Sequence, residues 1–137
     1  MARYFNLTSM LEYLEEVFPQ VKGKIRILSL GTEVVCVKLQ PTEADLRPGG
    51  TVSGPSMFLL ADVAFYVAVL AVLGKEPLAV TTSCSINFMR KPNPTDLIAE
   101  ARILKQGRKL IVGDVLLKSG SSEHIVAHAV FTYSVPS

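Results

Sequence analysis

Residues 54–73 read GPSMFLLADVAFYVAVLAVL and form the most unusual segment of this 137-residue chain. Sixteen of the twenty residues are apolar, and Asp62 carries the only charge. A helix that is apolar on all sides must be enclosed by protein or lipid. Only twelve uncharged residues, 63–74, follow Asp62, whereas a membrane span needs about 20. A carboxylate near the bilayer centre also costs about 3 kcal/mol. We therefore predict a long helix over residues 54–74 that a sheet encloses, and we expect no membrane partner.

A short helix and six β-rich segments flank this helix. Ser9 and Glu12 have the spacing of a helix capping box, and the apolar periodicity that follows ends at Pro19, which predicts an N-terminal helix within residues 1–20. The β-rich segments cover residues 24–30, 33–40, 78–89, 97–105, 109–118 and 123–134. We expect a hairpin before the long helix and a four-stranded antiparallel meander after it. The sequence thus predicts one α+β domain over residues 1–137, with a curved antiparallel sheet wrapped around the central helix.

The composition argues against several kinds of partner. Fourteen Lys and Arg residues are scattered among twelve Asp and Glu residues, which is not the basic patch of a nucleic-acid-binding protein. The first residues lack the apolar core of a signal peptide, so we expect a cytoplasmic protein. Cys36 and Cys84 have no second cysteine two residues away, and we expect buried thiols. His124 and His128 would lie about 13 Å apart on a strand, too far to chelate one metal unaided. We expect neither metal nor cofactor.

Two features of the long helix are candidates for chemistry. The turn over residues 48–55 contains three glycines, with Ser53 as a plausible N-cap and Pro55 in the first helical turn. A free amide at Gly54 could hold a developing oxyanion, although the same pattern also fits an ordinary capped helix start. Asp62 is costly to bury unless it is paired, so it is either a reactive carboxylate or a structural one.

Gly54 and Asp62 are too far apart to act on one carbonyl within one chain. Eight helical residues at 1.5 Å each separate them by about 12 Å. If both groups act, they must come from different protomers. An antiparallel meander also ends in edge strands that can pair with another copy. We therefore predict at least a homodimer, with the possibility of a homotetramer.

The same residues resemble a known family. Residues 46–62, LRPGGTVSGPSMFLLAD, resemble the signature of hotdog-fold acyl-CoA thioesterases of the phenylacetyl-CoA type. That signature reads Asn-Pro-x-Gly-x-x-His-Gly-Gly, then six residues and an Asp. Residues 82–92 resemble the strand after the helix, and residues 107–133 resemble the closing hairpin and the last strand. The resemblance therefore covers most of the chain and implies a hotdog fold.

The resemblance also implies a catalytic site shared by two protomers. Gly54 would donate its amide to the thioester oxygen, and Asp62 of the neighbouring protomer would be the general base or nucleophile. Thr82 matches the hydroxyl residue that helps orient the attacking water. Ser53 stands where the family has His, so it can cap the helix but cannot supply an imidazole.

Several further residues are candidates for substrate contacts. Arg47 and Pro55 stand where the family has Asn and the second Gly. Pro55 removes one N–H but leaves that of Gly54. Arg47 could bind a phosphate or carboxylate of a ligand, or form a salt bridge with an acidic neighbour. Arg108 and Lys109 follow a glycine at a turn, and this pair, together with Arg47 or Arg90, could attract the phosphates of coenzyme A.

The predicted function is hydrolysis of an acyl-CoA or related acyl thioester to a free acid and a thiol. The main alternative is a catalytically silent hotdog dimer that binds an acyl thioester or another small acid. A weaker alternative is a structural or membrane-associated protein built on the apolar helix. A free-thiol release assay distinguishes the enzyme from the other two.

Overall fold

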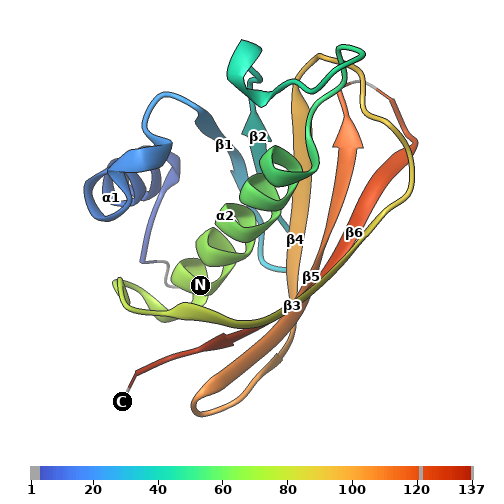
Figure 1. The fold of residues 1–137 in the computed structure, drawn as a ribbon. Helices are drawn as coiled ribbons and strands as arrows, with labels where there is room; N and C mark the ends of the chain where they lie inside the picture. Colours follow the sequence, from blue (N-terminus) through green and yellow to red (C-terminus); the bar gives the residue numbers. More distant parts are fainter. Residues whose placement is uncertain (1–3, 121, 137) are drawn as a thin grey trace.

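The computed structural model describes residues 4–120 and 122–136. Figure 1 shows a long helix lying across a strongly curved sheet. In chain order the elements are α1 (Leu7–Val17), a short 3-10 helix η1 (Pro19–Val21), β1 (Ile25–Leu30), β2 (Val35–Leu39), a second 3-10 helix η2 (Glu43–Asp45), α2 (Gly54–Leu73), β3 (Val80–Phe88), β4 (Leu97–Gln106), β5 (Leu110–Ser119) and β6 (Ile125–Ser134). The predicted α+β class and the helix-wrapping sheet are confirmed.

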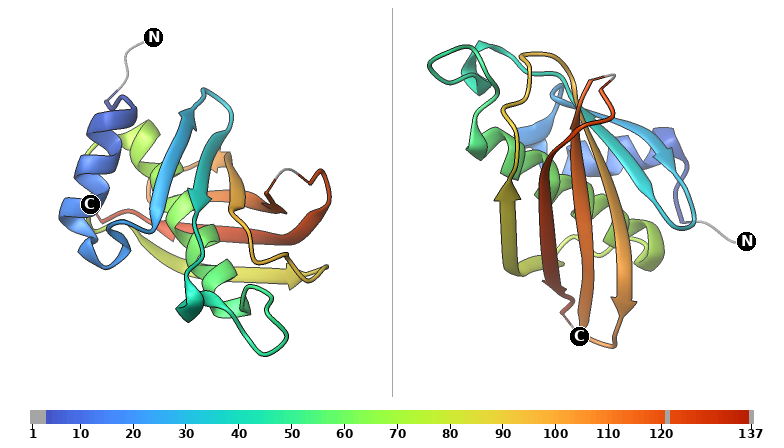
Figure 2. Two further views of the ribbon diagram at one scale, coloured as in Figure 1. Left: turned by 90° about the horizontal axis from the view of Figure 1, so that it is seen from above. Right: turned by 90° about the vertical axis from the view of Figure 1, so that its right-hand side faces the viewer.

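All neighbouring strands are antiparallel, in the order β1-β2-β4-β5-β6-β3. The predicted four-stranded meander is wrong in one respect, because β3 pairs with β6 and not with β4. Residues 89–96 lead from β3 to β4 across the intervening strands, as both views of Figure 2 show. This crossing places β3 at one edge of the sheet, and β1, next to α1, at the other.

Helix α1 begins earlier than its predicted cap. Asn6 is the N-cap and accepts a hydrogen bond from the Ser9 amide at 2.8 Å, while the Ser9 hydroxyl accepts from the Asn6 amide at 2.9 Å. The predicted pairing of Ser9 with Glu12 is therefore wrong. Asn is as good a cap as Ser, and this start buries Phe5 and Met10 at the positions of a hydrophobic staple.

Helix α2 is the core of the molecule. Twelve of its residues are buried, and they cover nearly all sides of the helix. It is long and apolar enough to cross a membrane by composition, but 61% of its most apolar window is buried inside the protein. The continuous apolar pattern of this segment thus corresponds to a helix held inside a curved sheet.

A single glycine lets α2 approach the sheet closely. The Phe65 ring is fully buried and stacks on Phe131, with ring centroids 5.4 Å apart. A Cβ atom at Gly113 of β5 would overlap the Phe65 ring and the Arg102 carbonyl oxygen. Only glycine leaves room for this aromatic contact, so Gly113 sets the distance between helix and sheet.

We expect Gly113→Ala to lower the free energy of unfolding by about 1–3 kcal/mol, because it overpacks a filled core. Urea denaturation of both proteins measures this difference. Gly54→Ala is a matched control, since its Cβ would lie at an ordinary 3.5 Å from the Phe88 ring. Equal losses of stability in the two variants would contradict the role given to Gly113.

Candidate active site

Asp62 lies in the middle of α2 and is held by two hydroxyl groups. Its Oδ1 atom accepts hydrogen bonds from Thr81 Oγ1 at 2.5 Å and from Tyr133 Oη at 2.8 Å. Burial raises the pKa of Tyr133 well above its ordinary value, and the nearby Asp62 charge adds to this. The phenol therefore keeps its proton and acts as a donor. Two neutral donors fix one carboxylate oxygen and leave the other for chemistry.

The second carboxylate oxygen, Oδ2, reaches a pocket. It accepts no hydrogen bond within the described part of the chain. Every buried side-chain oxygen in that part has a hydrogen-bond partner, so Oδ2 is not buried and is accessible. The pocket has a volume of about 190 Å³ and has both polar and apolar walls. Its lining includes Val17, Phe18, Asp62, Val63, Tyr66, Pro77, Ala79, Val80, Thr81 and Tyr133. Burial raises the pKa of Tyr66 to about 12, and its hydroxyl donates to the Pro77 carbonyl at 3.0 Å.

The start of α2 presents one unpaired amide. Ser53 is the N-cap, as predicted: its hydroxyl accepts from the Ser56 amide at 3.3 Å and its carbonyl accepts from the Met57 amide at 3.0 Å. Pro55 has no amide hydrogen. The Gly54 amide makes no hydrogen bond within the described residues. It is thus free to bind an oxyanion at the positive end of the helix dipole.

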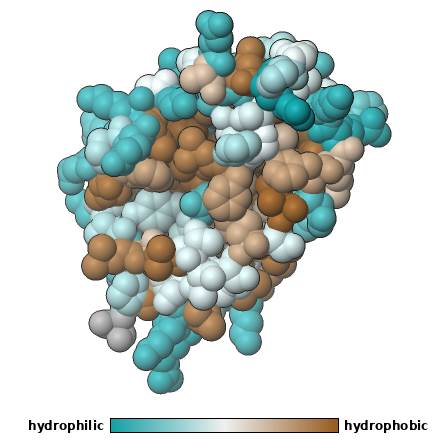
Figure 3. All heavy atoms as spheres, in the orientation of Figure 1, coloured by the Kyte–Doolittle hydropathy of each residue, from teal (hydrophilic) through white to brown (hydrophobic). Residues whose placement is uncertain are grey.

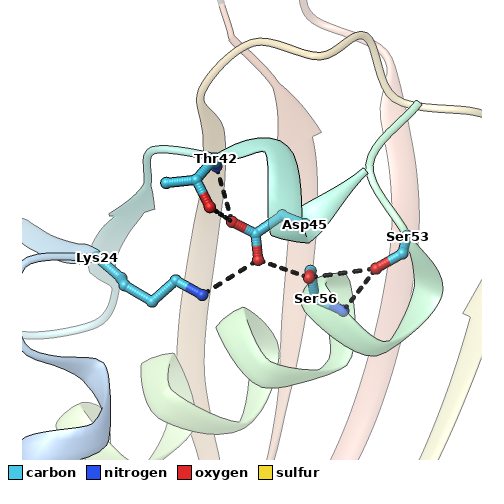
Figure 4. Close-up of polar contacts among 5 residues, drawn as sticks. All are labelled: Lys24, Thr42, Asp45, Ser53 and Ser56. Carbon is cyan, nitrogen blue, oxygen red and sulfur yellow. Dashed lines mark hydrogen bonds and ion pairs between the residues drawn. The ribbon is translucent and has the colours of Figure 1, made fainter. Parts of the chain in front are cut away.

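A buried carboxylate holds this helix start in place, as Figure 4 shows. Asp45 is only 2% exposed, and its carboxylate accepts from the Thr42 amide and the Ser56 hydroxyl, each at 2.8 Å, and from the Lys24 ammonium at 3.2 Å. The Asp45 carbonyl accepts from the Ser53 amide at 2.7 Å. This cluster was not predicted from the sequence, although the spacing of Thr42 and Asp45 is that of a capping box.

The charge state of Asp45 follows from these contacts. Burial alone would raise its pKa, but the hydrogen bonds from Thr42, Ser56 and Lys24 outweigh burial and hold the pKa below its ordinary value. An ionised carboxylate therefore ties η2 to the first turn of α2. Because the Ser53 and Ser56 side chains both join this network, the position of the Gly54 amide depends on it.

Thr82 makes no hydrogen bond with Asp62 among the described residues. A β-bulge between Thr81 and Ser83 interrupts the pairing of β3 with β6, and Thr82 lies exposed in it. Its neighbour Thr81 points to Asp62 instead. A bulge changes which residues share a face of the strand, so side-chain alternation alone could not choose between the two threonines. Tyr133 was also missed, because its partner lies 71 residues away.

The predicted substrate-binding residues fall into two groups. Arg47 and Arg90 line a pocket of about 390 Å³ that also contains Gly54, while Pro55 beside it is exposed. Arg108 and Lys109 lie in the turn between β4 and β5, where the Lys109 carbonyl accepts from Val135 just beyond β6. This turn is at the Val80 end of β3, whereas Gly54 is at the Phe88 end. The fold therefore places Arg47 and Arg90 near Gly54, whereas Arg108 and Lys109 of the same chain lie at the opposite end of β3.

The Gly54 pocket and the Asp62 pocket share no lining residue. Strand β3 connects them, since Thr81 lines the Asp62 pocket and Phe88 lines the Gly54 pocket. The separation predicted from the helix geometry, about 12 Å, is consistent with this arrangement. One chain therefore contains both groups but in separate places.

No metal-binding cluster of three or more His, Cys, Asp or Glu side chains occurs among residues 4–120 and 122–136. His128 instead contacts Asp114, with 2.9 Å between Nε2 and Oδ2. Asp114 also accepts two hydrogen bonds from Arg102, whose guanidinium is the main cause of the lowered pKa of this carboxyl. The histidine is thus part of an ionic cluster on the sheet.

A six-stranded antiparallel sheet wrapped around one long helix is the hotdog fold. The family model described as the thioesterase superfamily matches residues 49–125, more than half of the chain. A candidate thioesterase from Silicibacter sp. TM1040 is 52% identical over the whole chain and 96% of its own length, with a TM-score of 0.92. The chain therefore belongs to the thioesterase superfamily, and it is a thioester hydrolase. The resemblance seen in the sequence is confirmed.

Two further structures are similar. The PaaI protein of the E. coli phenylacetic acid degradation operon is 25% identical, with a TM-score of 0.75, over 93% of this chain and 95% of its own. Zebra fish thioesterase superfamily member 2, 22% identical over 96% of this chain and 99% of its own, has a TM-score of 0.84 and supports the fold. No protein with a curated description matches the chain.

We expect Asp45→Asn to lower the free energy of unfolding at pH 7 by about 1.5–3 kcal/mol, because it weakens hydrogen bonds to a buried charge. The folded-state pKa lies below that of the unfolded chain. The ionised carboxylate therefore stabilises the fold above about pH 4, and this stabilisation is lost as the pH falls through the folded-state pKa. Urea denaturation over this range should show the difference between parent and variant shrinking at low pH.

The neighbouring exposed residue Glu43 provides the control for this experiment. Glu43→Gln also removes one charge from η2 but breaks no hydrogen bond of the network, so we expect a change within about 0.5 kcal/mol. A pH-independent difference between the Asp45 variant and the parent would show that its charge does not stabilise the fold.

Proposed function

We propose that the protein hydrolyses an acyl-CoA or related acyl thioester to a free acid and a thiol, at a site shared by two protomers. The observation that carries this proposal is the placement of two complementary groups at opposite ends of one edge strand. An accessible Asp62 oxygen lies near the start of β3, and the unpaired Gly54 amide lies near its end.

The exposed edge of β3 supports a dimer. Within the chain β3 pairs only with β6, and apolar side chains near its ends are exposed: Val80 57%, Phe88 51% and Met89 56%. Figure 3 shows apolar side chains gathered on the face that carries α2 and β3. Unpaired edges of this kind are usually covered. Antiparallel pairing of two β3 strands about a two-fold axis brings the start of one beside the end of the other.

That pairing completes the site. The Gly54 amide of one protomer donates to the thioester oxygen, while the partner's Asp62 accepts a proton from water. The oxygen of that water attacks the carbonyl carbon, the carbon–sulfur bond breaks, and the thiolate leaves and takes up a proton. Alternatively, the carboxylate attacks the carbonyl directly and water then hydrolyses the resulting anhydride. A single oxyanion donor of this kind contributes about 10²–10³ to the rate.

We expect Asp62→Asn to lower kcat at least about 100-fold, because the amide cannot act as base or nucleophile. The variant keeps an acceptor oxygen for the Thr81 and Tyr133 hydroxyls, so its melting temperature should not fall. The measurement is free-thiol release from short, medium, long and aromatic acyl-CoAs. Near-parental turnover in a folded variant would remove Asp62 from the mechanism. Binding of acyl-CoA by the parent without thiol release would favour the silent binder.

Mixing two inactive variants tests whether the site is shared. Gly54→Pro removes the amide donor at a helix position where proline is tolerated, and Asp62→Asn removes the carboxylate. In a random mixture half of the dimers are heterodimers, and one of their two sites is intact, so we expect about a quarter of the parental activity. Absence of activity, once a mixed-tag pull-down has shown subunit exchange, would contradict the shared site.

A further inference from the structure

The peptide group between Ser53 and Gly54 has its orientation fixed by two hydrogen bonds. A peptide group is planar and trans, so the Gly54 N–H and the Ser53 C=O point in opposite directions. The Ser53 carbonyl accepts from the Met57 amide at 3.0 Å, and the Ser53 amide donates to the Asp45 carbonyl at 2.7 Å. The direction of the Gly54 N–H therefore depends on how Asp45 holds Ser53.

The Asp45 side chain makes a second link to the same helix turn. Its Oδ1 atom accepts from the Ser56 hydroxyl and its Oδ2 atom from the Thr42 amide, each at 2.8 Å (Figure 4). The Ser56 amide in turn donates to the Ser53 hydroxyl at 3.3 Å. Asp45 thus binds a residue before Gly54 through its carbonyl and a residue after Gly54 through its carboxylate.

Lys24, just before β1, holds the Asp45 carboxylate from the other side. Its ammonium lies 3.2 Å from Asp45 Oδ1. Its backbone is anchored, since its amide donates to the Val21 carbonyl at 3.1 Å and its carbonyl accepts from the Gln40 amide at 3.3 Å. Among residues 4–120 and 122–136 this is the only ion pair of Asp45. Lys24 is therefore the cation that balances the buried charge.

Stability alone does not explain a buried charge at this place. Removing a carboxylate from water is costly, and apolar residues of similar volume often stabilise a fold as well as a buried ion pair does. Hydrogen bonds to a charged group are shorter and stronger than neutral ones, so they hold their donors more closely. In this protein those donors flank the Gly54 amide, which is where precise placement affects the reaction.

We propose that Asp45 is a positioning residue for thioester hydrolysis, which directs the Gly54 amide at the substrate oxygen, and that Lys24 holds Asp45 in place. This inference rests on the proposed function, in which Gly54 is the oxyanion donor. The thioester oxygen gains negative charge in the transition state, so a misdirected donor lowers kcat more than it raises KM. A displacement of about 1 Å can slow a reaction about 100-fold.

The test measures kcat and KM for acyl-CoA hydrolysis in Asp45→Asn, Lys24→Met and the double variant, below the melting temperature of each. We expect kcat to fall about tenfold or more in Asp45→Asn and about fivefold in Lys24→Met, with KM within about twofold. Because Lys24 acts through Asp45, the double variant should match Asp45→Asn within about twofold, whereas independent effects would multiply to about 50-fold. Multiplied effects, or parental kcat in Asp45→Asn, would overturn the proposal.

Two control variants separate positioning from the loss of an ion pair. Lys24→Arg keeps the charge, so its kcat should stay within about twofold of the parent. Lys118→Met breaks a pair of similar length, 3.3 Å, with Glu100, which alternates with the buried Ala99 and Ala101 and so lies on the outer face of the sheet. We expect this variant to keep the parental kcat. Equal losses in Lys118→Met and Lys24→Met would contradict a specific role for Lys24.

A structural measurement distinguishes failure of this inference from failure of the proposed function. The residual dipolar coupling of the Gly54 N–H bond reports its direction by NMR and needs no turnover. We expect it to change in Asp45→Asn and Lys24→Met but not in Lys118→Met. If the parent releases no thiol and this pattern holds, the proposed function fails and Asp45 still directs the amide. If the parent hydrolyses thioesters and the coupling is the same in Asp45→Asn, only the positioning role is overturned.

Discussion

Burial of one apolar helix against a curved sheet organises the whole molecule. Helix α2 is apolar nearly all round, so the sheet must bend around it, and Gly113 lets Phe65 pack directly against β5. The same burial makes Asp62 conspicuous, since a carboxylate in this helix needs partners. Strands β3 and β6 supply them through Thr81 and Tyr133. The site is thus a consequence of how the core is closed.

The sequence predicted the features that depend on local pattern. The long helix, the Ser53 cap and the candidate groups at Gly54 and Asp62 follow from hydropathy, spacing and family resemblance. Features that depend on distant partners could not be predicted in this way. The pairing of β3 with β6 arises from a crossing connection, and the hydrogen bond from Thr81 to Asp62 forms beside a β-bulge. Tertiary packing decides both.

The departures from the family signature have structural explanations. Ser53, in place of His, caps α2 and is linked through Ser56 to buried Asp45. Pro55, in place of Gly, has no amide and leaves that of Gly54 as the free donor in the first turn. Arg47, in place of Asn, lines the pocket at Gly54. The three substitutions therefore leave the Gly54 amide without a hydrogen-bond partner among the described residues, and they change how the helix start is held and what surrounds it.

A crystal structure of the protein with a non-hydrolysable ketone analogue of an acyl-CoA tests the shared site most directly. The ketone carbonyl stands for the thioester carbonyl. We predict that its oxygen lies within hydrogen-bond distance, about 2.7–3.1 Å, of the Gly54 amide of one protomer, with the carboxylate of the partner's Asp62 beside the carbonyl carbon. A carbonyl bound by both groups of one chain, or bound away from Gly54, would contradict the proposed arrangement.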